Sequence, residues 1–189
     1  MSGPTYYAQH REDQWIAEYL PLPDKGFYVD IGCAHPFTQS NTAFLRDRKW
    51  DGLAIDGNPN WIDDWKGIPV FHCAIISEEP QVLFFEDTYW SHISPCCGKP
   101  RKSETIEQFL ERFGVGKIDF MSLDTEGTEF EILQSFDFER HDPSIVIVEY
   151  NAGHFPVIGP HQSPLPDFMR SKGYELPFIF PPVNMIFCK

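Results

Sequence analysis

The stretch F-Y-V-D-I-G-C-A-H-P-F-T-Q-S-N-T, residues 27–42, sets the expected fold of this chain. It opens with a short run of aromatic and β-branched residues, which predicts a strand buried on both faces. Gly32 then permits a tight turn, and Pro36 prevents the strand from continuing. Ser40 or Asn41 is placed to cap a following helix. Open α/β sheets bind ligands where a strand, a small-residue turn and a helix start meet, so we expect a pocket here.

The composition indicates one globular domain over residues 1–189, with a cover helix in residues 1–26 and the core of the domain in residues 27–189. The formal net charge of −13 disfavours nucleic acid as a partner, because phosphate binding needs clustered Lys and Arg. The same acidity is compatible with a cationic small ligand. The short basic cluster of Lys99, Arg101 and Lys102 is interpreted as a solvated loop rather than a phosphate site.

The sequence also predicts a cytoplasmic protein without a membrane partner. No apolar run approaches the roughly 18 residues of a membrane span, and the polar N-terminus lacks a signal-peptide pattern. The five cysteines have no framework spacing, so we expect reduced thiols. His92, Cys96 and Cys97 lie close in sequence and raise the alternative of a zinc site. Adjacent cysteines seldom bind one metal, however, and no fourth ligand is evident.

Apolar runs that predict strands alternate with segments of helical periodicity. Residues 81–85 are expected to pair with residues 70–76 through the polar turn between them, and residues 87–102 are expected to form an irregular loop. This alternation predicts an α/β fold, a largely parallel sheet with helices on both faces. The last two strands lack a long crossover, so one of them is expected to run antiparallel. The expected strands are residues 27–31, 50–56, 70–76, 81–85, 117–123, 144–148, 174–180 and 184–188.

Acidic residues follow several of these strands at their carboxyl ends. In a doubly wound sheet these ends share one edge, and like charges crowded there require a cationic cofactor, a divalent metal or a basic side chain. Asp56 lies about 20 residues beyond the glycine turn, where a carboxylate can accept both hydroxyls of a ribose. A simple turn aspartate is the alternative for this residue. The acids at the edge are Asp30, Asp56, Asp124, Glu126 and Glu149.

Four motifs in this order resemble the FkbM-type methyltransferases, which belong to the class I, Rossmann-like, S-adenosylmethionine-dependent methyltransferases. They are D-I-G-C-A-H-P with S-N-T, W-D-G-L-A-I-D-G-N-P, I-D-F-M-S-L-D-T-E-G-T-E and I-V-I-V-E, within residues 26–151. The resemblance implies a class I methyltransferase sheet that is mostly parallel with an antiparallel C-terminal strand. It also implies O-methylation of a small hydroxylated acceptor, such as a saccharide.

The resemblance also implies a cofactor site for S-adenosylmethionine. Asp30 and Gly32 would lie beside the methionine part, Asp56 would bind the ribose, and Cys73 with Ala74 would flank the adenine. Three acids would face the sulfonium and the acceptor: Asp124, Glu126 and Glu149. The expected cofactor-binding set is completed by Cys33, Ser40, Asn41 and Asn58. The chain departs from the family pattern at His35-Pro36, and it is short.

Proton removal from the acceptor has several candidate groups. His35 is a candidate general base because its unperturbed pKa is about 6.5 and it lies on the cofactor turn. A side chain hydrogen-bonded within the turn is an equal alternative for His35. Asp124 and Glu149 are further catalytic candidates, and with Asn151 they could bind Mg²⁺, which prefers oxygen ligands. Catechol O-methyltransferases look similar at these strand ends.

Two other functions remain open at this point. A nicotinamide-dependent oxidoreductase shares the strand, the turn and the ribose acid, but the glycines of G-x-G-x-x-G are missing after Gly32. A non-catalytic binding or assembly domain would keep the fold without the reaction. Specificity for the acceptor is expected to depend on loops such as residues 87–102 and 151–166.

Overall fold

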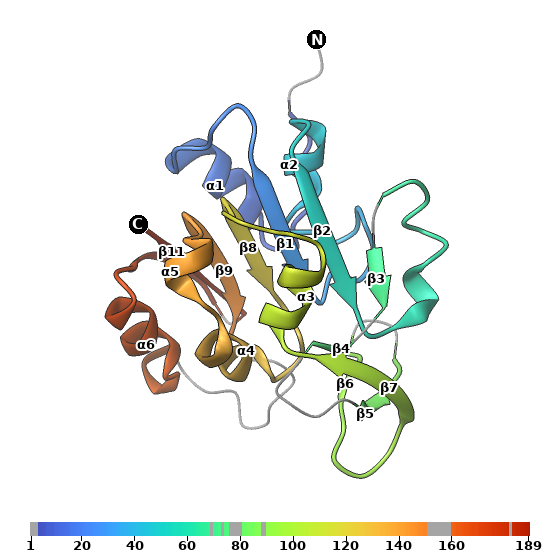
Figure 1. Ribbon diagram of the computed structural model, residues 1–189. Helices are drawn as coiled ribbons and strands as arrows, with labels where there is room; N and C mark the ends of the chain where they lie inside the picture. The colour runs from blue at the N-terminus through green and yellow to red at the C-terminus, as the bar shows by residue number, and fades with distance from the viewer. Residues whose placement is uncertain are drawn as a thin grey trace.

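The fold is organised around a seven-stranded sheet (Figure 1). The computed structural model describes residues 4–68, 70–72, 74–75, 81–87, 90–150, 160–181 and 183–189. The strand order is β10-β11-β9-β8-β1-β2-β3. The strands are β1 (Phe27–Ile31), β2 (Asp51–Asp56), β3 (Val70–His72), β8 (Phe120–Leu123), β9 (Ile145–Glu149), β10 (Glu175–Phe180) and β11 (Asn184–Cys188).

The inner strands of this sheet follow the parallel pattern predicted from the alternation of elements. β1 pairs in parallel with β2 and β8, and β8 pairs in parallel with β9. β11 runs antiparallel to both β9 and β10, which confirms the predicted antiparallel C-terminal strand. The chain builds the sheet outward from β1 in two directions, so the switch point lies between β1 and β8. Parallel sheets of this kind bind ligands at that point.

Helices cover both faces of the sheet, as predicted. One face is covered by α3 (Ile106–Arg112), α4 (Glu129–Ser135), α5 (Phe138–His141) and α6 (Leu165–Ser171), whose apolar residues join one core cluster. The opposite face is covered by α1 (Glu12–Tyr19) and α2 (Ala43–Asp47), which contribute Ile16, Phe44 and Leu45 to a second cluster. Two short 3₁₀ turns complete the helical elements, η1 (Pro59–Trp61) and η2 (Pro160–Gln162).

A second sheet of order β4-β7-β5-β6 lies beside the ends of β2 and β3 (Figure 1). It consists of β4 (Ala74–Ile75), β5 (Gln81–Phe85), β6 (His92–Ile93) and β7 (Lys99–Glu104). The predicted pairing of residues 81–85 with residues 70–76 is wrong, because β5 pairs antiparallel with β6 and β7. The expected irregular loop at residues 87–102 likewise contains two strand segments.

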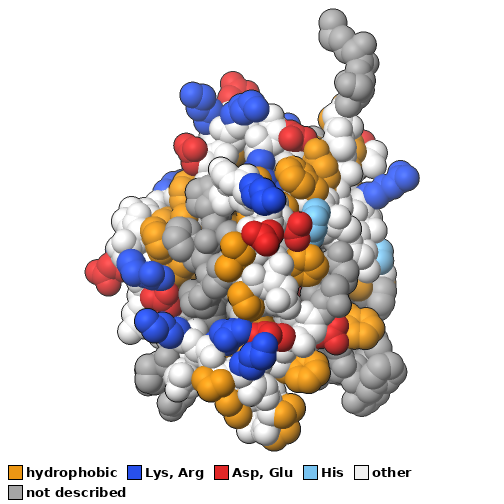
Figure 2. Space-filling model, turned by 90° about the vertical axis from the view of Figure 1, so that its right-hand side faces the viewer, with side chains coloured by type: hydrophobic (Ala, Val, Ile, Leu, Met, Phe, Trp, Pro, Cys, Tyr) orange, Lys and Arg blue, Asp and Glu red, His pale blue; other side chains and the backbone are white. Residues whose placement is uncertain are grey.

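The reason for these two errors is the polarity of β7. Its sequence K-P-R-K-S-E lacks the apolar alternation of a strand, and only one of its six residues, Ser103, is buried. Glu86 pairs with Lys99 and Arg101, and these ion pairs offset the charge of the strand. Figure 2 shows basic, acidic and apolar side chains mixed at the lower end of one face of the molecule. The predicted solvated basic cluster is therefore a strand with paired charges.

Candidate functional site

The turn after β1 passes very close to the end of β8. Gly32 has a φ of +79°, and a Cβ atom at this position would lie 1.6 Å from the backbone oxygen of Asp124. The amides of Gly32 and Cys33 both donate to the backbone oxygen of Ile55, at 2.8 and 3.1 Å. The turn therefore joins the carboxyl ends of three neighbouring strands, and only glycine fits at its closest point.

Asp56 joins the loop after β2 to the turn after β1. Its carboxylate accepts a hydrogen bond from the amide of Ala34 at 2.8 Å and another from the amide of Asn58 at 2.7 Å. Burial raises the pKa of Asp56 to about 6, although these two hydrogen bonds favour the ionised form. A carboxylate has about four lone-pair sites, so Asp56 can still accept hydroxyl groups from a ligand.

A cavity of about 590 Å³ opens along this edge of the sheet. Its described lining contains no Lys or Arg, whereas six carboxylates contribute to it. Aromatic side chains from η1, β5 and the following loop also reach it, namely Trp61, Phe84 and Trp90. The six acids are Asp30, Asp56, Asp87, Asp124, Glu126 and Glu149. This confined negative charge suits a cationic ligand.

Three of these acids form a tight group. Ligand atoms of Asp124, Glu126 and Glu149 all lie within 4.8 Å of one another. Burial and the neighbouring negative charges raise the pKa of Glu126 to about 8. Asp124 and Glu149 are hydrogen-bonded, and burial raises the pKa of both, so the pair holds a proton near neutral pH. Such a pair can accept or release a proton at the cavity wall.

Comparison with known proteins supports a methyltransferase. A model of the methyltransferase FkbM domain matches residues 98–176. The resemblance to the FkbM methyltransferases is confirmed. The crystal structure of precorrin-6y C5,15-methyltransferase from Geobacter metallireducens GS-15 is similar in fold, with a TM-score of 0.54 and 12% identity over 100% of this chain and 93% of that chain. No curated protein matches.

The FkbM match contains the D-T-E-G-T-E motif and β9, whereas the turn after β1 precedes it. The structure nevertheless brings both parts to one cavity. Nine of the site residues expected from sequence line it: Asp30, Gly32, Cys33, Ser40, Asn41, Asp56, Asp124, Glu126 and Glu149. Cys73 and Asn151 lie outside the described residues, and Ala74 lies in β4.

Asp30 and its neighbours hold the first loop of the cavity in place. The Oγ1 of Thr42 donates to Asp30 at 2.6 Å, and burial raises the pKa of this aspartate. Ser40 accepts hydrogen bonds from the amides of Thr42 and Ala43, but the N-cap of α2 is Thr42, so the predicted cap at Ser40 or Asn41 is wrong by one or two residues. Asn41 donates to Ser122 at 3.5 Å, which joins this loop to β8.

His35 lies on the turn but does not line the described cavity. Its Nδ1 accepts hydrogen bonds from the amides of Phe37 at 3.1 Å and Thr38 at 2.9 Å. With Nδ1 as an acceptor, the proton of a neutral imidazole resides on Nε2, so neither nitrogen offers a free lone pair. This geometry favours the alternative interpretation, in which His35 is hydrogen-bonded within its own turn.

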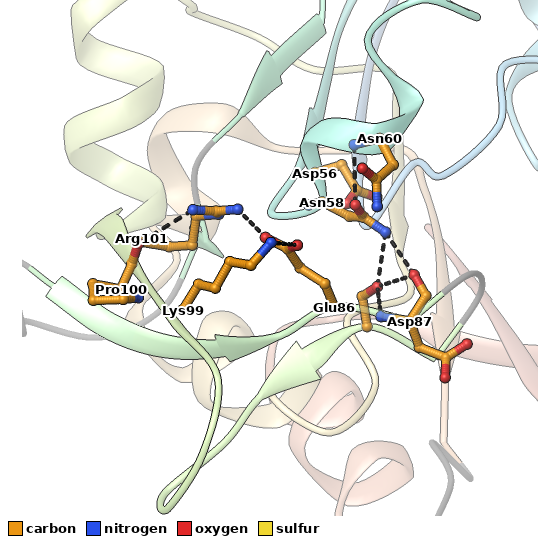
Figure 3. A network of polar contacts seen from close by, with 9 residues as sticks. Asp56, Asn58, Asn60, Glu86, Asp87, Lys99, Pro100 and Arg101 are labelled. Atoms are coloured by element: carbon orange, nitrogen blue, oxygen red, sulfur yellow. Dashed lines mark hydrogen bonds and ion pairs between the residues drawn. The ribbon is translucent and has the colours of Figure 1, made fainter.

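Asn58 connects the end of β2 to the loop before β6 (Figure 3). Its Nδ2 donates to the backbone oxygen of Asp87 at 2.7 Å and to Ser91 at 3.0 Å, and its Oδ1 accepts the amide of Asn60. Its side chain is fully buried and does not line the main cavity. Asn58 therefore holds this loop, and its expected cofactor contact stays a prediction.

The zinc alternative finds no support in the described part of the chain. Among those residues, the only cluster of acids, thiols or imidazoles with metal-binding geometry consists of Asp124, Glu126 and Glu149. The Nδ1 of His92 contacts the backbone oxygen of Trp90 at 3.0 Å. Within the same described residues, no helix combines the length and apolar character needed to cross a lipid bilayer.

Two functional residues were not identified from the sequence. Glu129 is buried and accepts the amides of Thr125 and Gly127, so it shapes the loop that carries Glu126. The last acid of D-T-E-G-T-E was the signal for this role, because a carboxylate near a helix start binds free amides. Asn184 lines the cavity from β11, and no local pattern distinguishes it from an ordinary strand residue.

Proposed function

We propose that this protein is an S-adenosylmethionine-dependent methyltransferase that transfers the methyl group to a hydroxyl of a sugar or another small molecule. The observation that carries the proposal is the acidic cavity at the switch point of the sheet. S-adenosylmethionine bears a sulfonium and an ammonium, and the described lining offers carboxylates without Lys or Arg. The FkbM match and the fold support the same class of reaction.

The residues present fit this cofactor. Gly32 would let the backbone approach the methionine part, and Asp30, which is buried and bonded to Thr42, would lie beside it. Asp56 lies at the end of β2, where its remaining lone pairs can accept the ribose hydroxyls. When bound, the cofactor supplies a methyl carbon activated by positive sulfur. The chain must then align the acceptor and remove its proton.

The pair Asp124–Glu149 is the best-placed group for that proton. Both residues line the cavity. The pair holds one proton near neutral pH, so one of the two carboxylates stays ionised and can accept another. The carboxylate pair would accept the hydroxyl proton of the acceptor as its oxygen becomes the nucleophile. Asp124→Asn removes the carboxylate that Glu149 leaves ionised, so it should lower kcat at least about tenfold.

A magnesium ion is a second candidate for activation of the acceptor. The observation in its favour is the group Asp124, Glu126 and Glu149, whose ligand atoms lie within 4.8 Å. Carboxylates are suitable ligands for such a hard cation, which would lower the pKa of a bound hydroxyl. The reaction should be compared in EDTA and in Mg²⁺. Equal rates would assign proton removal to the carboxylates alone.

Calorimetric titration tests the cofactor separately from the acceptor. S-adenosylmethionine and S-adenosylhomocysteine should bind, and NAD should not. Binding of NAD alone would favour an oxidoreductase. Absence of binding for all three would favour the non-catalytic assembly domain.

A further inference from the structure

Two buried hydrogen-bond acceptors on the cavity wall have no partner. They are Oε2 of Glu149 and Oδ1 of Asn184, whose residues are 8% and 4% exposed. Both residues line the cavity. They are direct partners across β9 and β11, and such antiparallel neighbours hold their side chains on one face, roughly 5 Å apart. A buried acceptor without a donor costs free energy. We therefore expect a ligand at this part of the wall to donate hydrogen bonds to these two atoms.

Glu12 fixes the orientation of the Asn184 side-chain amide. Its Nδ2 donates to Oε1 of Glu12 at 2.7 Å, and Glu12 is fully buried. The other oxygen of Glu12 accepts the amide of His10 at 2.8 Å. A carboxylate accepts hydrogen bonds, so the NH₂ group of Asn184 must face Glu12. The atom left without a partner is therefore an acceptor.

The negative charge of the cavity also disfavours an anionic acceptor. Six carboxylates line it, and its described lining has no Lys or Arg. The sequence outside the described residues adds none: residues 1–3, 69, 73, 76–80, 88–89, 151–159 and 182 contain no Lys or Arg. An anionic acceptor would therefore enter without a matching cation. The carboxylate of the cofactor differs, because it is accompanied by its own ammonium.

We propose that the methyl acceptor is a neutral or cationic molecule whose hydroxyl or amino groups donate to Glu149 and Asn184, and that acceptors bearing phosphate or carboxylate groups are excluded. Asn184 is then a specificity-determining and positioning residue. An anionic group brings only further acceptor atoms and like charge to this wall, so its desolvation is not compensated. The inference rests on the proposed methyltransferase function and names the substrate class of the same site.

The charge of the methylated product tests this proposal while the acceptor is still unidentified. The protein is incubated with methyl-tritiated S-adenosylmethionine and a deproteinised small-molecule extract of the source organism, in EDTA and in Mg²⁺. Labelled products are then separated by ion exchange. We expect label in the neutral or cationic fraction. A labelled product retained on the anion exchanger, in either condition, overturns the inference alone. Absence of any labelled product overturns the methyltransferase proposal as well.

The role of Asn184 is tested with the acceptor so obtained. Asn184→Ala should raise the acceptor KM about tenfold, as expected for one lost hydrogen bond, without changing the affinity for S-adenosylhomocysteine. Asn60→Ala, at an exposed position outside the main cavity, is the matched control and should change neither. An unchanged KM in Asn184→Ala would overturn the assignment.

A double variant separates positioning from folding. Asn184→Ala also removes the partner of Glu12, which can lower stability. Glu12→Gln combined with Asn184→Asp keeps the buried hydrogen bond with donor and acceptor exchanged, keeps the net charge, and keeps an oxygen at the cavity wall. It should restore a KM within about threefold of the parent. A double variant that is stable but has the KM of Asn184→Ala would contradict the role of the Asn184 oxygen.

Discussion

Replacement of Gly32 by alanine should disrupt the site through one steric contact. The added Cβ would lie 1.6 Å from the backbone oxygen of Asp124, whereas real Cβ contacts are essentially never below 3.0 Å. The two backbones must therefore separate by at least about 1.4 Å. Overpacking of this kind costs about 1–3 kcal/mol, and a positive φ adds about 1–2 kcal/mol for a non-glycine residue. We expect Gly32→Ala to lose about 2–5 kcal/mol of unfolding free energy.

Gly67→Ala is the matched control for this prediction. Gly67 has a nearly identical φ of +78°, but a Cβ at that position meets nothing within 4 Å. It should therefore lose only the backbone contribution, about 1–2 kcal/mol. Urea unfolding gives both values, and titration with S-adenosylhomocysteine should show weakened binding for Gly32→Ala alone. Equal losses of stability in the two variants would show that the turn does not approach Asp124 closely.

Three further predictions concern the acids and the histidine. Asp56→Ala should weaken S-adenosylhomocysteine binding by about 1.5–3 kcal/mol, and unchanged affinity in calorimetry would remove the ribose role. The pKa of Asp56 is raised from 3.8 to about 6, so the folded state binds its proton more tightly than the unfolded state. Unfolding free energy should consequently rise by up to about 3 kcal/mol from this group as the pH falls from 7 to 4, and urea titrations showing the opposite slope would contradict this assignment. His35→Ala should lower stability by about 1–2 kcal/mol through two lost hydrogen bonds, with a smaller effect on kcat than Asp124→Asn. A larger loss of kcat at intact cofactor affinity would instead support His35 as the base.

The local elements and the acidic edge could be predicted from the sequence. Residues 27–31 and 144–148 are short apolar runs. A run of this kind predicts a buried strand from residues that are adjacent in the chain. Because carboxyl ends of parallel strands share one edge, the order of elements alone brought Asp30, Asp56 and Asp124 together. The cavity lining confirms this arrangement.

Long-range partners were decided only by the tertiary structure. The bond between Asn184 and Glu12 spans 172 positions, and the contact of Gly32 with Asp124 joins separate motifs. The polar strand β7 gains its partner from β5, which its own sequence does not indicate. The role of His35 likewise depends on nearby backbone amides, and that of Asn58 depends on the backbone oxygen of Asp87. Periodicity records which face of an element is buried, whereas a polar side chain acts according to the donors and acceptors that folding brings beside it.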